Sequence, residues 1–233
     1  SGAVVACPNC RKSGIRVSWP GLYSIPGNAA GSTSISGGKL SIGSGGSVTW
    51  NEVTGQAMSY PQPWSLVWSG TVDINRDNPI VTIGMGETLA VLSLGKSGGK
   101  LTVGGSTVWS QALPWLRETD RFTVVIANGN VYLRQITLVG GIYPLTTLFP
   151  SVTLFPIQEH EELRIFTGGA DMTGKTITSL TLGGVQTCDY LWVTGETLDE
   201  STLAQILSLE GWTPGAFSGN TLFQTDFAGG GLQ

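Results

Sequence analysis

Apolar and polar residues alternate along most of the chain in short runs, which is the period-two pattern of strands with one buried face. The run Ser65–Ile74 shows it, Phe122–Ala127 and Val131–Val139 are two further apolar runs of strand length, and Gly, Asn, Asp and Pro gather between neighbouring runs. Many short strands at regular spacing, separated by turn residues, indicate a sandwich or barrel. The pattern therefore predicts an all-β, antiparallel fold.

Two pairs of runs carry hairpin signals. Asn128 and Gly129 join two apolar runs, and both residue types tolerate the positive φ angles of a type I′ turn. The segment Lys39–Trp50 alternates around a Gly-Ser-Gly-Gly sequence at 43–46. We therefore expect a hairpin at each of these two places.

One short helix is predicted near the C-terminus, within Thr197–Gly211. Its apolar residues share one helical face, and Thr197 and Glu200 have the spacing of a capping box; the apolar residues are Leu198, Leu203, Ile206 and Leu207. We expect this helix to cover an open end or edge of the sandwich.

Residues 1–30 lack sustained periodicity and contain Arg11, Arg16 and Trp19 in an otherwise acidic chain. A segment that buries little apolar surface by itself becomes ordered on a partner. We interpret residues 1–30 as an extended assembly arm and residues 31–233 as the sandwich domain. The alternative is that the arm forms the first strand of the sandwich itself.

The charge composition excludes several classes of partner. Only 12% of the residues are charged, the formal net charge is -4, and there are 34 glycines. Nucleic-acid binding needs clustered Lys and Arg, so none is expected. No run approaches the roughly 18 to 20 apolar residues of a membrane helix, so membrane insertion is not expected either.

The chain has three cysteines, Cys7, Cys10 and Cys188, and their chemical state can be interpreted in several ways. Cys7 and Cys10 have the spacing of a zinc knuckle, but a complete site needs two more ligands. Only Cys188 and the lone His160 could supply them. Free thiols, a disulfide or redox pair, and zinc are the alternatives, and we expect no metal and no cofactor.

Two segments of the chain are rich in side-chain oxygens and are candidates for a chemical site. Asp73, Asn75, Asp77 and Asn78 offer oxygens of the kind that calcium binds, but turn chemistry accounts for them without a metal. The acidic cluster 159–162 follows Pro156, and we interpret it as a solvated turn. No paired carboxylates of the kind that retaining glycosidases need stand out, so we expect no enzyme activity.

Eight tryptophans are many for this length. Trp64, Trp68 and Trp192 lie in apolar strand runs and are expected in the core. Trp109 and Trp115 flank a Gln-Ala-Leu-Pro segment that we expect to be a loop. Because exposed aromatic rings stack on sugars and anchor interfaces, Trp109 and Trp115 are the predicted ligand-binding pair.

Several segments together resemble the concanavalin A-like or laminin-G-like jelly-roll family. Segment 64–68 is similar to an early inner strand of that family, and 122–133 to its central hairpin. Segment 188–193, followed by 197–203 and Ile206, resembles its late strand and short helix, although the Glu usual in that helix is missing. The resemblance covers roughly residues 34–227.

The resemblance implies an antiparallel jelly-roll β-sandwich with one short helix near the C-terminus. Members of the family mostly bind glycans or proteins, some are glycosidases, and some are adhesins or coat decorations of viral particles. Fold alone does not choose among these. Three functions are therefore expected in order: a non-enzymatic phage virion component, a secreted or cell-surface glycan-binding module, and last a glycoside hydrolase.

The virion hypothesis carries expectations about partners and location. A capsid decoration, head fibre or tail receptor-binding protein would bind other virion proteins or copies of itself, as a homo-oligomer, and a cell-surface glycan is a further candidate partner. It would be made in the host cytoplasm and end in the virion. The lectin-like alternative would be extracellular.

Overall fold

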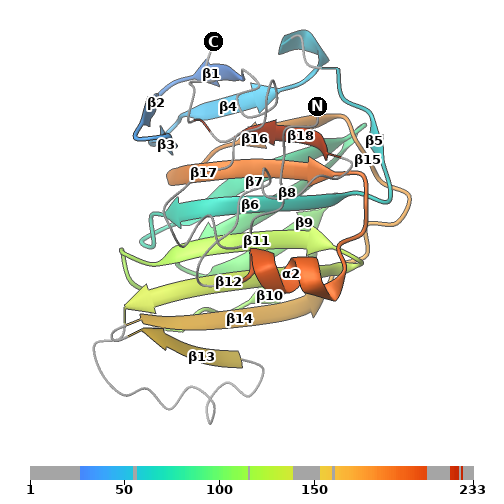
Figure 1. The fold of residues 1–233 in the computed structure, drawn as a ribbon. Helices are drawn as coiled ribbons and strands as arrows, with labels where there is room; N and C mark the ends of the chain where they lie inside the picture. The colour runs from blue at the N-terminus through green and yellow to red at the C-terminus, as the bar shows by residue number, and fades with distance from the viewer. Residues whose placement is uncertain are drawn as a thin grey trace.

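Two antiparallel sheets face each other in the computed structural model (Figure 1). The structure describes residues 27–54, 57–114, 116–138, 153–158, 161–208, 221–225 and 227. The inner faces of the sheets share a hydrophobic core, as expected when two half-apolar sheets must both bury one face. The predicted all-β jelly-roll sandwich with one short helix near the C-terminus is confirmed.

The smaller sheet has seven strands in the order β1-β4-β16-β7-β8-β9-β10. They are β1 (Asn28–Ala30), β4 (Ser47–Trp50), β7 (Asp77–Met85), β8 (Thr88–Gly95), β9 (Gly98–Val103), β10 (Ser106–Gln111) and β16 (Ser179–Leu182). The strands β7 to β10 follow one another as a meander, because short turns join each to the next.

The larger sheet has nine strands in the order β13-β14-β12-β11-β6-β17-β3-β2, and β18 pairs with the second half of β17. They are β2 (Thr33–Ser36), β3 (Lys39–Ile42), β6 (Ser65–Val72), β11 (Arg121–Ala127), β12 (Asn130–Leu138), β13 (Thr153–Gln158), β14 (Glu161–Gly169), β17 (Gln186–Thr194) and β18 (Thr221–Thr225). Two short strands, β5 (Tyr60–Pro61) and β15 (Thr176–Ile177), form a separate ribbon, and a 3-10 turn, η1, spans Glu52–Thr54.

The core between the sheets contains large aromatic side chains. Trp50, Trp64 and Trp68 are almost fully buried there, and the indole of Trp68 donates a hydrogen bond to Gln186 Oε1 at 2.9 Å. Trp192 is also buried, but on the outer face of the larger sheet. The prediction that Trp64, Trp68 and Trp192 are buried is therefore confirmed, with Trp192 in a second apolar cluster.

Helix α2 (Glu200–Ile206) lies across the outer face of the larger sheet, in front of β11 and β12 (Figure 1). Leu203 and Ile206 pack there against Val67 and Val125, which point away from the main core. Strands β6 and β11 thus bury both faces. The expectation that the helix covers an end or edge of the sandwich is wrong, because the apolar outer residues of these central strands need a cover.

The N-terminal cap of α2 differs from the predicted one. Asp199, rather than Thr197, is the cap, and its carboxylate accepts a hydrogen bond from Thr202 N at 2.7 Å. At the other end, Arg134 Nη1 donates to Ser208 O at 2.8 Å. Both ends of a short helix are therefore tied by side chains, which offsets its few internal hydrogen bonds.

The two hairpin predictions have opposite outcomes. Asn128 and Gly129 have φ angles of 55° and 74° and join β11 to β12, as predicted. The hairpin expected at Lys39–Trp50 is wrong: β3 pairs with β2 and β17, whereas β4 pairs with β1 and β16 in the other sheet. Residues 43–46 cross from one sheet to the other, because β3 and β4 each complete a different sheet.

A polar cluster is buried where β11 begins. Asp120 accepts hydrogen bonds from Gln135 Nε2 at 2.7 Å and Arg117 N at 3.1 Å, and fully buried Arg164 forms an ion pair with Glu162 at 2.9 Å. Residues 161 and 162 are the first two residues of strand β14. The expectation of a turn at 159–162 is wrong for these two residues, because Glu162 is held as the partner of a buried guanidinium.

The predicted arm falls mostly outside the described residues. Of its thirty positions, the structure describes residues 27–30. Asn28–Ala30 form β1 and pair with β4 in the smaller sheet. The last part of that segment is thus a strand of the sandwich, and the assembly role of residues 1–26, with Arg11, Arg16 and Trp19, stays a prediction. Within the described part of the chain, no helix has the length and apolar character needed to cross a membrane.

The contact between α2 and the sheet can be measured with Ile206→Ala. Ile206 is fully buried between the helix and the outer face, and removing such a side chain costs about 2–5 kcal/mol. We expect a loss of this size in the free energy of unfolding, measured by urea denaturation. Ala204→Ser on the exposed side of the helix is the control and should change stability by less than about 0.5 kcal/mol. Equal, small effects of both would show that the helix is not docked.

Asp120 should make stability depend on pH. Burial raises the pKa of the Asp120 carboxyl above its ordinary value, so the folded chain binds this proton more readily than the unfolded chain. Its contribution is then greatest below the unfolded pKa and is lost as the pH rises through the folded pKa. Asp120→Asn, which does not ionise, should gain stability relative to the wild type as the pH increases across that window.

Asp199→Asn gives the matched control with the opposite sign. The hydrogen bond from Thr202 lowers the pKa of Asp199, so its contribution is present above the unfolded pKa and is lost as the pH falls through the folded pKa. Urea unfolding at a series of pH values measures both variants. A pH-independent difference between Asp120→Asn and the wild type would contradict the prediction.

Candidate functional site

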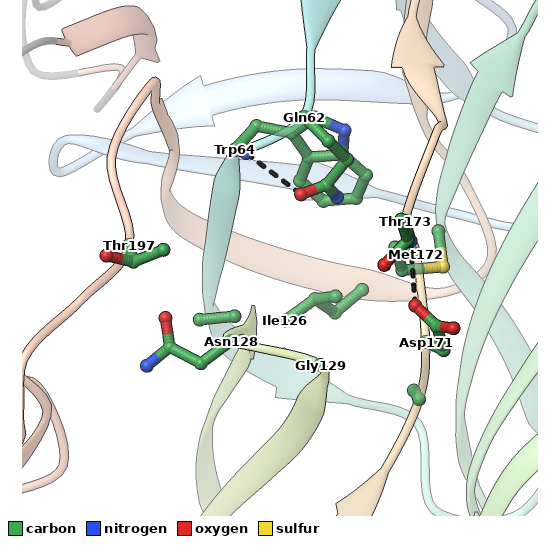
Figure 2. A pocket seen from close by; sticks show the side chains of 11 residues that line it. Gln62, Trp64, Ile126, Asn128, Gly129, Asp171, Met172, Thr173 and Thr197 are labelled. Carbon is green, nitrogen blue, oxygen red and sulfur yellow. Dashed lines mark hydrogen bonds between the residues drawn. The ribbon is translucent and has the colours of Figure 1, made fainter.

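A small hollow lies at the end of the sandwich where β11 turns into β12 (Figure 2). Four connections of the chain line it, and each follows or precedes a strand of the sandwich. They contribute residues 62–64 before β6, 126–129 at the β11–β12 turn, 170–173 after β14, and Thr197 after β17. Positions far apart in the sequence meet here because these strand ends lie together.

The floor of the hollow is apolar. Trp64, Ile126, Ala170 and Met172 line it and are nearly fully buried. Trp64 is held at both polar ends, since its indole donates to Lys175 O at 3.0 Å and its backbone N–H donates to Gln62 Oε1 at 3.2 Å. Figure 2 shows the Gln62 amide lying over the hollow beside this tryptophan. Trp64 is therefore fixed in place at the base of the hollow.

Asn128 sets the wall on the helix side. Its side chain accepts a hydrogen bond from Leu198 N at 3.1 Å and donates to Leu198 O. These two bonds fix the segment that carries Thr197 and leads into α2. An asparagine is suited to this position because it tolerates the positive φ angle of the turn and offers both a donor and an acceptor.

Asp171 is the acidic residue of the wall opposite Thr197 (Figure 2). Its carboxylate accepts a hydrogen bond from Thr173 N at 2.9 Å, and hydrogen bonds from Thr173 lower the pKa of Asp171. Asp171 is therefore ionised at neutral pH. Among the described residues lining the hollow it is the single acidic one, whereas retaining glycosidases use two carboxyl groups about 5 Å apart.

The arrangement is suited to holding a small polar ligand. Ligand sites typically have apolar walls with a few placed polar groups that fix orientation. Here the Gln62 amide, the Asp171 carboxylate and the Thr173 and Thr197 hydroxyls surround the apolar floor. One carboxylate and several neutral donors and acceptors can bind hydroxyl groups, since a carboxylate accepts from two of them at once.

Trp109, one member of the predicted aromatic pair, is not exposed as expected. Trp109 lies in β10 and is 6% exposed, and its ring covers two glycines of neighbouring strands. A Cβ built on Gly168 would lie 2.4 Å from the Trp109 ring, and one on Gly99 would lie 2.6 Å from it. The exposure predicted for Trp109 is wrong because these glycines make room for the ring inside the core. Trp115 lies outside the described residues, so ligand binding at this pair stays untested.

The cysteine predictions are tested in part. Cys188 is a free thiol, fully buried in the main core, and burial raises its pKa well above the ordinary value. A buried thiol of raised pKa is unreactive. Cys7, Cys10 and His160 lie outside the described residues. The described part of the chain contains no group of three or more His, Cys, Asp or Glu side chains that could hold a metal.

The oxygen-rich turn uses its side chains to hold itself together. Asp73 accepts from Asn75 N at 2.9 Å and pairs with Arg76 Nε at 2.9 Å. Asp77 accepts from the backbone and hydroxyl of Ser97 at 2.7 and 2.9 Å. Buried Asn78 donates to three backbone carbonyls. In the structure these side chains therefore stabilise the turn through hydrogen bonds and an ion pair, as turn residues do.

The sequence reasoning missed most of this hollow. Its polar residues come from three separate connections, Gln62 from one, Asp171 and Thr173 from a second and Thr197 from a third, and none of these segments predicts a binding site by itself. Two local signals pointed to parts of it. Asn128 was found as a turn residue, and Asp171-x-Thr173 has the spacing of an Asx turn.

Comparisons with known proteins give partial structural likenesses. No family model matches the chain, and no curated protein sequence matches it. Tailspike protein 2 of the Escherichia coli O157:H7 bacteriophage CAB120 is 14% identical with a TM-score of 0.47, over 87% of this chain and 29% of that one. Trypanosoma rangeli sialidase in complex with sialic acid is 15% identical with a TM-score of 0.39, over 84% of this chain and 35% of that one.

A third likeness is to a domain of similar length. The exoplasmic/lumenal domain of VIP36, in its Ca²⁺/Man-bound form, is 8% identical with a TM-score of 0.32, over 75% of this chain and 85% of that one. The chain thus spans about a third of the length of the tailspike and sialidase structures. With TM-scores below 0.5, these likenesses decide neither the fold nor the activity of this chain.

Proposed function

We propose that this protein is a non-enzymatic binding component of a phage virion, and that the hollow at the β11–β12 end of its sandwich binds a glycan. The observation that carries the glycan part is the lining of the hollow. Neutral donors and acceptors and one ionised carboxylate surround a floor of nearly fully buried apolar side chains. A sugar offers hydroxyl groups around its ring, and these can bond to such donors and acceptors.

Binding rather than hydrolysis is supported by the count of carboxylates. Asp171 is the single acidic residue among the described residues that line the hollow. Hydrolysis by a pair of carboxyl groups would need a second acidic residue beside Asp171. Its pKa is lowered, which suits an acceptor of hydrogen bonds and not a proton donor near neutral pH.

The virion assignment rests on the sequence. The chain has few charges and many Gly, Ser and Thr residues, and residues 1–26 concentrate basic and aromatic side chains such as Arg11, Arg16 and Trp19 in an acidic chain. A decoration, fibre or receptor-binding protein needs both a docking segment and an outward-facing domain. A secreted or cell-surface glycan-binding module is the alternative function, and it shares the hollow but not the virion partners.

The glycan part is tested by binding to a printed panel of bacterial surface polysaccharides and oligosaccharides. We expect at least one specific ligand, and we expect Asp171→Asn and Thr173→Val to weaken its binding at least tenfold, which corresponds to about 1.4 kcal/mol. Asp199→Asn is the matched control, since Asp199 also accepts a backbone N–H but lies outside the hollow. It should bind as the wild type does.

Two outcomes would contradict the proposal. Binding to no glycan on the panel would contradict the ligand class, and release of new reducing ends that is lost in Asp171→Asn would contradict the non-enzymatic role. The virion part is tested separately, by antibody detection of the protein in purified particles. Absence from particles together with a retained glycan ligand would favour the lectin-like alternative.

A further inference from the structure

An open groove lies on the outer face of the larger sheet, at the ends of β6 and β17 away from the hollow. The hollow borders the start of β6, at Trp64, whereas the groove borders its end, at Thr71. The groove is therefore a separate feature. Its polar lining consists mainly of hydroxyl side chains: Ser32, Ser34, Ser41, Thr71 and Thr187, with Asp73 at the rim.

Four of these hydroxyl residues stand in one register row across four adjacent strands. Ser34 of β2 is opposite Ser41 of β3, Ser41 is opposite Thr187 of β17, and Thr187 is opposite Thr71 of β6. Neighbouring strands lie about 4.7–4.9 Å apart. The row thus presents hydroxyl groups at regular steps along the groove.

The hydroxyls of this row have hydrogen-bonding capacity to spare. Thr71 and Thr187 bond to each other through their hydroxyls, which leaves one of the two hydrogens for another acceptor. Ser34 and Ser41 make no side-chain hydrogen bond to any other residue in the described part of the chain. Each of these serines can therefore both donate to a ligand and accept from it.

The two rims of the groove are fixed by the backbone. On one rim Gly43 N donates to Ser32 O at 2.9 Å, and a Cβ on Gly43 would lie 2.6 Å from Ser32 Oγ. On the other rim the carboxylate of Asp73 is occupied by Asn75 N and Arg76 Nε. The groove is preformed, and its one acidic lining residue is neutralised by a neighbouring cation.

We propose that this groove is a second binding site, which takes an extended, neutral glycan chain. An anionic ligand would need cationic groups, and the nearby Lys39 of the same face is paired with Asp189 at 3.3 Å. The lining also includes the apolar residues Ile42, Val72 and Val185, and the hydroxyl row beside them supplies the polar partners. A chain of sugar units offers repeated hydroxyls that can bond to successive strands. The inference rests on the proposed function for its ligand class and adds a second location.

The test is a two-dimensional ¹H–¹⁵N NMR titration of the full chain with maltohexaose, cellohexaose and chitohexaose, each used separately. We expect at least one of them to shift the backbone resonances of Ser34, Ser41, Thr71 and Thr187. The double variant Ser41→Ala/Thr187→Val should weaken the binding seen at these resonances at least fivefold. Resonances of Asn128, Asp171 and Thr173 report the hollow independently.

The smaller sheet offers a matched control for this variant. Thr49 and Thr181 also face each other across two strands and bond through their hydroxyls at 3.2 Å, but neither lines the groove. Thr49→Val/Thr181→Val should leave the groove's affinity unchanged. An equal loss in both double variants would overturn the inference, because it would show a general effect of removing hydroxyls.

The two proposals fail in different ways. If none of the three hexasaccharides shifts the groove resonances, the second site is wrong, whether or not the hollow responds. Shifts at the hollow alone would support the proposed function and overturn the second site. Shifts at the groove that the Ser41→Ala/Thr187→Val variant removes, with none at the hollow, would support the second site and contradict the hollow as the glycan site.

Discussion

The pairing of β6 with β17 is the contact on which the rest of the structure depends. The two strands pair along almost their whole length, from Ser65 opposite Thr194 to Val72 opposite Gln186. Gly70 permits this approach, because a Cβ there would lie 1.9 Å from Thr187 O. Both strands bury residues on both faces, inward against the smaller sheet and outward beneath α2. The candidate hollow and the groove lie at opposite ends of this pair.

Buried amides connect the two sheets around that pair. Gln186 donates to Ile80 O of the smaller sheet at 2.8 Å and accepts from the indole of Trp68. Asn78 donates to Leu94 O at 3.0 Å and accepts from Val185 N at 3.1 Å. Because an unpaired buried amide costs about 1–3 kcal/mol, these bonds specify how the β6–β7 turn lies against the start of β17. That turn carries Asp73, a rim of the groove.

A neutral surface and preformed recesses suit the same kind of work. The chain carries few charges, so attraction over long distances contributes little to recognition. Affinity then depends on donors and acceptors that are already in position, since ordering them on binding would cost entropy. In the hollow, Asn128 fixes the Thr197 segment and Asp171 is fixed by Thr173. In the groove, the register of the strands performs that role.

The sequence by itself determined the features that arise from neighbouring residues. Period-two alternation identified the strands, Asn128-Gly129 identified its turn, and the apolar face of 198–207 identified the helix. Tertiary structure decided what depends on distant partners: that β3 and β4 join different sheets, and that Trp109 is buried over Gly99 and Gly168. It also brought together the hollow's residues from four separate connections. Local propensity acts over a few residues, whereas sheet membership, burial and the site depend on contacts between residues that are tens of positions apart or more.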